Sequence, residues 1–226
     1  MTVSMTSEPV ETAAPAPSGG RGLRAVLLAV IGVALLVLGG ALAVGLGIGR
    51  EATPAADSVD AGFSRDMATH HLQAVEMANL AADRSTDSEV RQLAFDIAEL
   101  QQNQAGRMQG WLSLWGVLPS GGTPMSWMGG HAGHSTTDDG LMPGMATEDE
   151  LAELRSLSGR AFDVRFLQLM IRHHQGGSDM ASYAAAHAEV PAVRSLARSI
   201  AETQQVETTT MARMLTDRGG RPLPAP

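Results

Sequence analysis

Two adjacent histidines flanked by methionines occur twice in this sequence, in DMATHHLQAVEMA at residues 66–78 and in LMIRHHQGGSDMA at residues 169–181. Imidazole nitrogen binds copper, zinc, nickel and iron, whereas thioether sulfur favours Cu(I). The mixture of these donors therefore indicates copper, as Cu(I) or Cu(II). The candidate metal ligands are His70, His71, Met67, Met77, His173, His174, Met170 and Met180.

Helical geometry decides which of these donors share a face. At about 100° per residue, His70 and Met77 lie about 20° apart, and Asp66 falls within about 40° of His70. Adjacent histidines diverge by about 100°, so the two members of a pair cannot point the same way. The phase of the apolar stripe favours His70 and His173 as the inward members.

Polar side chains also fall on the apolar faces of the helices that follow each pair. Gln101 and Gln204 occupy such positions, and Glu207 lies one turn further along. Buried polar groups need hydrogen-bond partners. In one interpretation these residues and Asp66 support metal-binding histidines from a second shell. In the other, the histidines and glutamines form a metal-free polar network, and the methionines only fill the core.

The connection between the two copies, residues 117–146, carries further donors. It is rich in Gly, Met, His, Ser and Pro and is too long for an ordinary packed connection, so we expect it to be functional or mobile. The strings WMGGHAGH and MPGM are either a loose copper site or simple low complexity. The candidate loop ligands are His131, His134, Met128, Met142 and Met145.

The rest of the chain is organised by an internal duplication. A shift that places His70 on His173 continues without a gap through the next helix, where Gln101, Gln102 and Met108 recur as Gln204, Gln205 and Met211. Each copy predicts a helical hairpin that cannot bury its apolar stripe alone. We therefore expect an all-α fold in which the two hairpins pair as a four-helix bundle. Whether the two His pairs share one site stays open.

Periodicity and capping signals place the helices of this bundle, which covers residues 58–218 and leaves a tail at 219–226. Capping boxes at Thr86–Glu89 and Thr147–Glu150 begin the second long helix and a short acidic helix. The long helices are expected near residues 58–84, 86–116, 160–187 and 191–218.

An uncharged apolar run at residues 25–49 precedes the bundle. About 20 apolar residues span a bilayer as a helix, and Arg21 and Arg24 on its amino side favour a cytoplasmic N-terminus. We expect a disordered cytoplasmic tail at 1–24, a single-pass transmembrane helix at 25–49, a linker at 50–57 and an extracytoplasmic bundle. A cleaved signal peptide, processed at the string ALA of residues 41–43, is the alternative.

Composition excludes several functions. The net charge of −8 opposes nucleic-acid binding. The absence of cysteine excludes disulfides, thiolate zinc sites and a lipid anchor on cysteine. The sequence has no HExxH, phosphate loop or nucleophile elbow, and Asp66 with His70 is only a weak acid-base signal. We expect no enzymatic activity, and a redox or hydrolytic enzyme is the weakest alternative.

At FSRDMATHHLQAVEMA, QLAFDIAELQQNQAGRMQGWLSLWG, MPGMATEDELAEL and FDVRFLQLMIRHHQGGSDMA the chain resembles the domain-of-unknown-function 305 family. The resemblance covers about residues 58–218. It implies a ferritin-like four-helix bundle, exported or anchored, with copper binding or tolerance in some members and no established activity. The histidine pairs, Met67, Met77, Met170 and Met180 match the repeated HHxxAxxMA motif.

The chain departs from the family pattern at two places. Gln104 stands in the first half where the second half has Glu207, and Gly176 and Gly177 replace a small and an aliphatic residue. Glycine inside a helix costs about 1 kcal/mol relative to alanine. These departures leave open whether the two halves form equivalent sites.

The sequence thus predicts a membrane-anchored extracytoplasmic protein that sequesters or delivers copper, or confers copper tolerance. The alternative is a structural or protein-interaction bundle with a buried His/Gln network. The expected partners are the metal ion and the membrane, and nothing in the sequence indicates a protein partner or an oligomer.

Overall fold

The structure is a computed structural model that describes residues 19–49, 53–129 and 140–226. The chain divides into two units, residues 1–52 and 53–226. The first unit contains α1 (Gly19–Gly45). Its segment Gly22–Gly45 has a mean hydropathy of 2.8, and among the described helices it alone is long and apolar enough to cross a membrane. A signal sequence near the N-terminus has the same properties.

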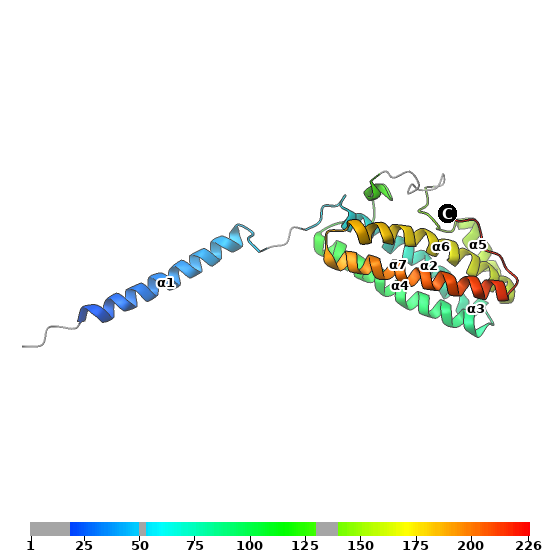
Figure 1. The fold of residues 1–226 in the computed structure, drawn as a ribbon, viewed down its shortest axis with the longest axis horizontal. Coiled ribbons are helices and arrows are strands. Elements are labelled where there is room, and N and C mark those ends of the chain that lie inside the picture. The colour runs from blue at the N-terminus through cyan, green and yellow to red at the C-terminus, as the bar shows by residue number, and fades with distance from the viewer. Residues whose placement is uncertain (1–18, 50–52, 130–139) are drawn as a thin grey trace, which may run out of the picture. The chain divides into compact units, whose positions relative to one another are not determined.

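The second unit is a four-helix bundle, drawn in cyan, green, yellow and orange-red in Figure 1. Its long helices are α2 (Val59–Asn79), α4 (Ser88–Trp115), α6 (Gly159–His187) and α7 (Pro191–Asp217). The short elements are α3 (Ala81–Arg84), the 3₁₀ helix η1 (Ser126–Met128) and α5 (Glu148–Ser156). Helix α2 packs on α4, α6 packs on α7, and α2 and α6 join the two hairpins. The predicted all-α bundle is confirmed, and the described residues contain no strand.

Local signals account for most helix ends. Gly116 ends α4 with a φ of 69°, the left-handed conformation that favours glycine. The capping box of Thr147 and Glu150 is confirmed at α5. The capping box predicted at Thr86 is wrong, because the Asp87 carboxylate accepts the backbone N–H groups of Glu89 and Val90 and so caps α4.

The first long helix is also shorter than predicted. Helix α2 ends at Asn79, and the backbone makes a tighter helical turn at Leu80 before α3 begins. Leu80 donates its N–H to the Met77 carbonyl, and Asp83 donates to the Leu80 carbonyl, so three-residue hydrogen bonds replace four-residue ones here. Such bonds narrow the helix and interrupt its regular path.

The core consists of two hydrophobic clusters, one toward each end of the bundle. The far cluster contains Met77 of α2 and Met170 of α6, together with Phe162 and Phe166. The loop-side cluster contains Met67 of α2 and Met180 of α6, together with residues of the connection such as Trp127, Met128 and Met142. Because Met67 precedes the His pair of α2 and Met180 follows that of α6, the two helices run antiparallel with their His pairs at the same level.

Two short stretches of the connection, around residues 125–128 and 142–146, pack against the bundle, whereas residues 118–124 are exposed. Trp127 is buried against α2 at Gly62, where an added Cβ would overlap its side chain. Met142 and Ala146 are also buried. Residues 140–147 then lead into α5. This packing brings the MPGM string against the two helices that carry the histidines.

Candidate metal centre

Four histidines meet between the two hydrophobic clusters. We call His70, His71, His173 and His174 the histidine layer; all four are fully buried. The imidazole rings of His70 and His173 face each other with centroids 3.8 Å apart and planes inclined by 37°. The two His pairs, 103 residues apart in the sequence, therefore form one layer, with His70 and His173 meeting at its centre as the helical phase predicts.

The outer histidines have side-chain partners on the neighbouring helix of their own hairpin. His71 Nε2 lies 2.8 Å from Gln104 Oε1, and His174 Nε2 lies 2.8 Å from Glu207 Oε2. These are equivalent contacts in the two repeats, because Gln104 and Glu207 occupy equivalent positions. One partner is a neutral amide and the other a carboxylate, so the two halves differ in charge.

The inner histidines are held differently. His70 Nε2 lies 3.1 Å from the Pro143 carbonyl oxygen. His173 has no hydrogen-bond partner at either ring nitrogen among the described residues. The Nδ1 atoms of His70, His71 and His174 are likewise buried without a partner there. The layer therefore holds ring nitrogens that nothing in the described protein uses.

The amides beside the layer are also unsatisfied. Both side-chain polar atoms of Gln204 and the Oε1 atom of Gln101 lack partners among the described residues. An added Cβ at Gly177 would stand 2.9 Å from Gln204 Oε1 and 3.0 Å from His70 Cε1, which places Gln204 beside the inner pair. A buried unpaired polar group costs about 1–3 kcal/mol. Their concentration here is what a site that receives a ligand would show.

Burial keeps His70, His71 and His173 neutral. Burial lowers the pKa of His70 from 6.5 to about 4, against the opposing hydrogen bond to Pro143. Burial and the neighbouring His70 lower the pKa of His71 to about 3. Burial and the other three histidines hold the pKa of His173 well below 6.5. Neutral imidazole is the form that binds a metal, so each of these three rings has one nitrogen with an available lone pair at neutral pH.

The four repeated methionines lie on both sides of the layer. Met67 and Met180 belong to the loop-side cluster, and Met77 and Met170 to the far cluster. All four are fully buried. Each cluster thus takes one methionine from each repeat, so the thioethers flank the histidines with the two-fold pseudosymmetry of the duplication.

The structure places the other predicted residues as follows. Met128 and Met142 are buried in the loop-side cluster, and Met145 packs against it. His131 and His134 lie outside the described residues. The Asp66 carboxylate accepts hydrogen bonds from Met125 and Trp127, and it bonds no histidine in the described part of the chain. Two groups beside the histidines were not predicted from the sequence. Gln104 could have been, because it occupies the position that corresponds to Glu207. The Pro143 carbonyl could not, because a backbone group has no characteristic residue type.

Two observations restrict what the site can be. Within the described residues, no group of three or more histidine and carboxylate side chains is arranged to hold a metal ion. Among the described residues, the buried thioethers of the flanking methionines are further soft donors near the layer. A pocket of 410 Å³ reaches the layer, and His174, Gln204 and Thr208 are among the residues that line it.

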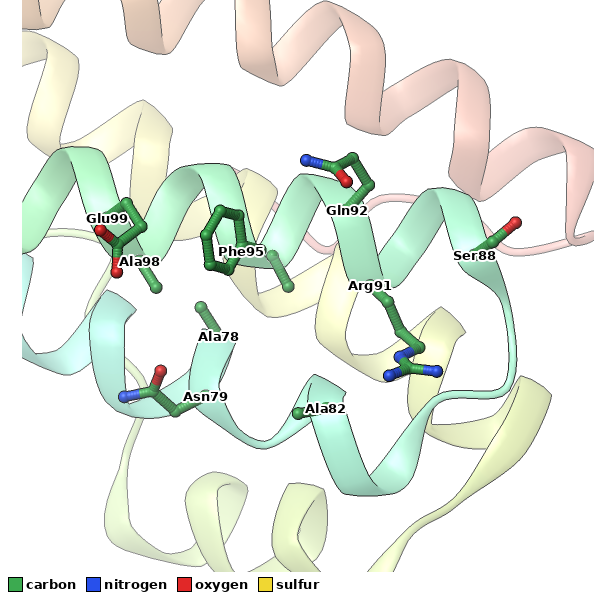
Figure 2. Close-up of a pocket in the computed structure, with 10 residues that line it drawn as sticks. Ala78, Asn79, Ala82, Ser88, Arg91, Gln92, Phe95, Ala98 and Glu99 are labelled. Carbon is green, nitrogen blue, oxygen red and sulfur yellow. The ribbon is translucent and has the colours of Figure 1, made fainter.

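A second pocket, of 480 Å³, lies away from the histidines. Figure 2 shows its walls on α2, α3 and α4, with Phe95 between Arg91 and Glu99 and small alanines opposite. It contains no imidazole or thioether. It is therefore not a candidate metal centre.

The chain matches one protein family and several solved structures. The family described as Domain of unknown function (DUF305) matches residues 60–215. A DUF305 protein from Streptomyces coelicolor, thought to be secreted, is 46% identical; the match covers 75% of this chain and 99% of that one, with a TM-score of 0.69. A DUF305 fragment from Deinococcus radiodurans is 35% identical over 70% of this chain and 96% of its own, with a TM-score of 0.58.

A third similar structure is CopM in a Cu(I)-bound form. It is 25% identical, with a TM-score of 0.56, and the match covers 71% of this chain and 98% of CopM. CopM structures with bound Cu(II) and with bound Ag are also similar to this chain. No protein with a curated description matches the chain.

Proposed function

The chain belongs to the DUF305 family, and from that membership together with the histidine layer we propose that it is a membrane-anchored extracytoplasmic protein that binds copper for sequestration, tolerance or delivery. The observation that carries the proposal is the contact between His70 and His173, whose rings lie 3.8 Å apart in a fully buried site. Each ring comes from a different repeat. Both keep buried nitrogens without partners among the described residues.

The donor types fit copper. Imidazole suits Cu(I) and Cu(II), and thioether suits Cu(I). His70, His71 and His173 supply neutral imidazoles. Four methionines lie in the clusters on either side of the layer: Met67, Met77, Met170 and Met180. The best candidates to hold the ion are His70 and His173, with these methionines and the remaining histidines as further donors. Bound copper would be the cargo of the protein, and we propose no catalytic role for it.

The relatives support the choice of ion. CopM has been solved with Cu(I), Cu(II) and Ag. Cu(I) and Ag(I) share a preference for soft donors such as thioether sulfur. At about a quarter identity this likeness supports copper as the ion to test first, and the residues that would hold it here are argued from the layer itself.

Helix α1 supports the proposed anchor. Its apolar stretch exceeds the usual apolar region of a signal peptide, which is about 7 to 15 residues long. Two arginines precede it, which favours an N-terminus inside and a bundle outside. Sequestration outside the cytosol agrees with a chain that uses methionine and histidine in place of cysteine, because these side chains form no disulfides.

A structural bundle with a polar network is the second candidate. The contacts of His71 with Gln104 and of His174 with Glu207 favour it, because they satisfy one nitrogen of each outer histidine without a metal. The inner residues argue against it. A network built only for stability would pair Gln204 and His173, whose polar atoms have no partners among the described residues.

A Cu(I) titration separates these functions. Residues 53–226 contain both hydrophobic clusters and form a compact unit. This domain, purified without a histidine tag, is titrated anaerobically against a chromophoric Cu(I) chelator beside a variant with alanine at His70, His71, His173 and His174. We expect the variant to lose at least 100-fold in affinity. Equal affinity contradicts the proposal and favours the polar network.

The control must show that lost stability alone does not remove copper. Asp87→Asn is suitable, because it weakens the ion pair with Arg218 at the far end of the bundle and leaves the layer intact. It should bind copper like the wild type. A decrease equal to that of the histidine variant would assign the effect to unfolding.

A further inference from the structure

The MPGM string forms a short strap on the histidine layer. We define the strap as residues 142–146, in which the Pro143 carbonyl oxygen lies 3.1 Å from His70 Nε2. Met142, at one end of the strap, is buried in the loop-side cluster with Met67 and Met180. The strap therefore contacts one candidate imidazole, that of His70, and shares a hydrophobic cluster with two candidate thioethers.

Two glycines let the strap approach α6. A Cβ added at Gly176 would overlap the Pro143 carbonyl, and one added at Gly144 would overlap the Arg172 carbonyl and stand 3.0 Å from His173 Cα. Gly144 also has a φ of 81°, a conformation that side chains rarely adopt. The mid-helix glycine at 176 is therefore required by a close approach of backbone to backbone. This approach compensates for its low helix propensity.

The first repeat holds the same strap by a different device. The Gln73 side chain donates to the Ala146 carbonyl at 2.9 Å and accepts the Ala146 N–H at 2.7 Å. Gln73 is the position of the first repeat that corresponds to Gly176 in the second. The two repeats have thus diverged at this position: Gln73 hydrogen-bonds the strap, and Gly176 leaves space for it.

The hydrogen bond to Pro143 fixes the tautomer of His70. A backbone carbonyl oxygen can only accept, so His70 Nε2 must carry the proton. In a neutral imidazole the lone pair then resides on Nδ1, which is buried without a partner among the described residues. In many metal sites a backbone carbonyl accepts the N–H of the ring nitrogen that does not bind the metal, and this bond orients the histidine.

We propose that the strap positions His70 for metal binding through Nδ1, with Gly176, Gly144 and Gln73 as the positioning residues that seat the Pro143 carbonyl. This inference rests on the proposed function and adds the binding atom and the element that selects it. The strap bonds His70 through the Pro143 carbonyl and places Met142 in the loop-side cluster. The position of the strap therefore sets both the orientation of the imidazole and the place of Met142.

The test reads the tautomer and the affinity separately. Long-range ¹H–¹⁵N NMR of the apo domain 53–226 distinguishes a protonated Nε2 from a protonated Nδ1 at His70. Gly176→Ala is compared with Gly106→Ala, a helical glycine with nothing within 4 Å of its added Cβ. We expect the Nε2–H form in the wild type and in Gly106→Ala. In Gly176→Ala we expect a mixture of tautomers and a Cu(I) affinity lower by about 10- to 100-fold.

A milder pair of variants decides the matter if Gly176→Ala does not fold. Gln73→Ala removes both bonds to Ala146, and Gln92→Ala removes one exposed bond to Asp96 on α4. Only Gln73→Ala should alter the His70 tautomer and the affinity. An unchanged Nε2–H tautomer and an unchanged affinity in the strap variants overturn the inference.

The two proposals fail in different ways. A wild-type domain that binds no copper contradicts the proposed function. The tautomer of His70 still supports or overturns the role of the strap, because it is measured without metal. An Nδ1–H form in the wild type contradicts the inference even where copper binds.

Discussion

The indole N–H of Trp127 donates a hydrogen bond of 2.8 Å to the carboxylate of Asp66. The same oxygen accepts the backbone N–H of Met125, also at 2.8 Å. Met125 has a φ of 66°, unusual for a residue other than glycine. Asp66 therefore holds the connection on α2, which explains why the first repeat has an aspartate where the second has the buried Leu169.

Asp66→Ala should destabilise the domain through the connection. The variant leaves two buried donors, on Trp127 and Met125, without an acceptor, so we expect the free energy of unfolding to fall by about 2 kcal/mol or more. Urea unfolding of residues 53–226 measures this free energy in the wild type and in the variant. The control Asp96→Ala changes an exposed aspartate of α4 and should cost less than about 0.5 kcal/mol. Equal losses in the two variants would contradict this role.

The sequence predicted the bundle and the inward-facing His70 and His173, because these follow from periodicity and duplication, but it left open whether the two His pairs form a single layer. It did not predict how the connection folds onto the bundle. The bond of His70 to Pro143 uses a backbone carbonyl, and the reason for Gly176 becomes visible only with the strap in place. Asp66 shares a helix face with His70, but its partners lie about 60 residues away along the chain. Long-range contacts of this kind leave no periodic signal.

The two outer histidines, His71 and His174, have different hydrogen-bond partners at equivalent positions of the two repeats, and exchanging these partners tests their role. His174 has the Glu207 carboxylate as its hydrogen-bond partner, whereas His71 has the neutral Gln104 amide. A carboxylate partner supports a metal-binding histidine more strongly than a neutral amide does. Glu207→Gln should therefore lower the Cu(I) affinity by about 10-fold. Gln104→Glu should raise it or leave it unchanged. Competition titrations measure both, and a higher affinity in Glu207→Gln would contradict the supporting role of the carboxylate.

The apo domain should lose stability as the pH falls from 7 to 5. Burial depresses the pKa of His70 from 6.5 to about 4 and that of His71 to about 3. Between these values and 6.5 the unfolded chain binds more protons than the folded one, so the stability is present above about pH 6.5 and is lost on acidification. His70 alone contributes about 2 kcal/mol of this loss at pH 5.

Urea unfolding of the apo domain at pH 7, 6 and 5 checks this prediction. The variant His70→Ala/His71→Ala, which lacks both imidazoles, should show a smaller loss between pH 7 and 5. A wild-type domain whose free energy of unfolding does not change over this range would show that the buried rings titrate normally or remain solvated.

Helix α1 should remain on the mature protein as an anchor. In cell fractions the full chain is expected with the membranes, released by detergent and retained at high salt. Peptide mass spectrometry should recover sequence from the N-terminal side of residue 41. A soluble exported form that begins just after residue 43 would instead establish a cleaved signal peptide.

The most direct test of the central claim is the position of copper in the folded domain. A crystal structure of residues 53–226 loaded with Cu(I), with anomalous differences collected at the copper edge, locates the ion without reference to affinity. The account predicts an anomalous peak at the contact of His70 and His173. A peak elsewhere on the protein, with the histidine layer unchanged, would contradict it.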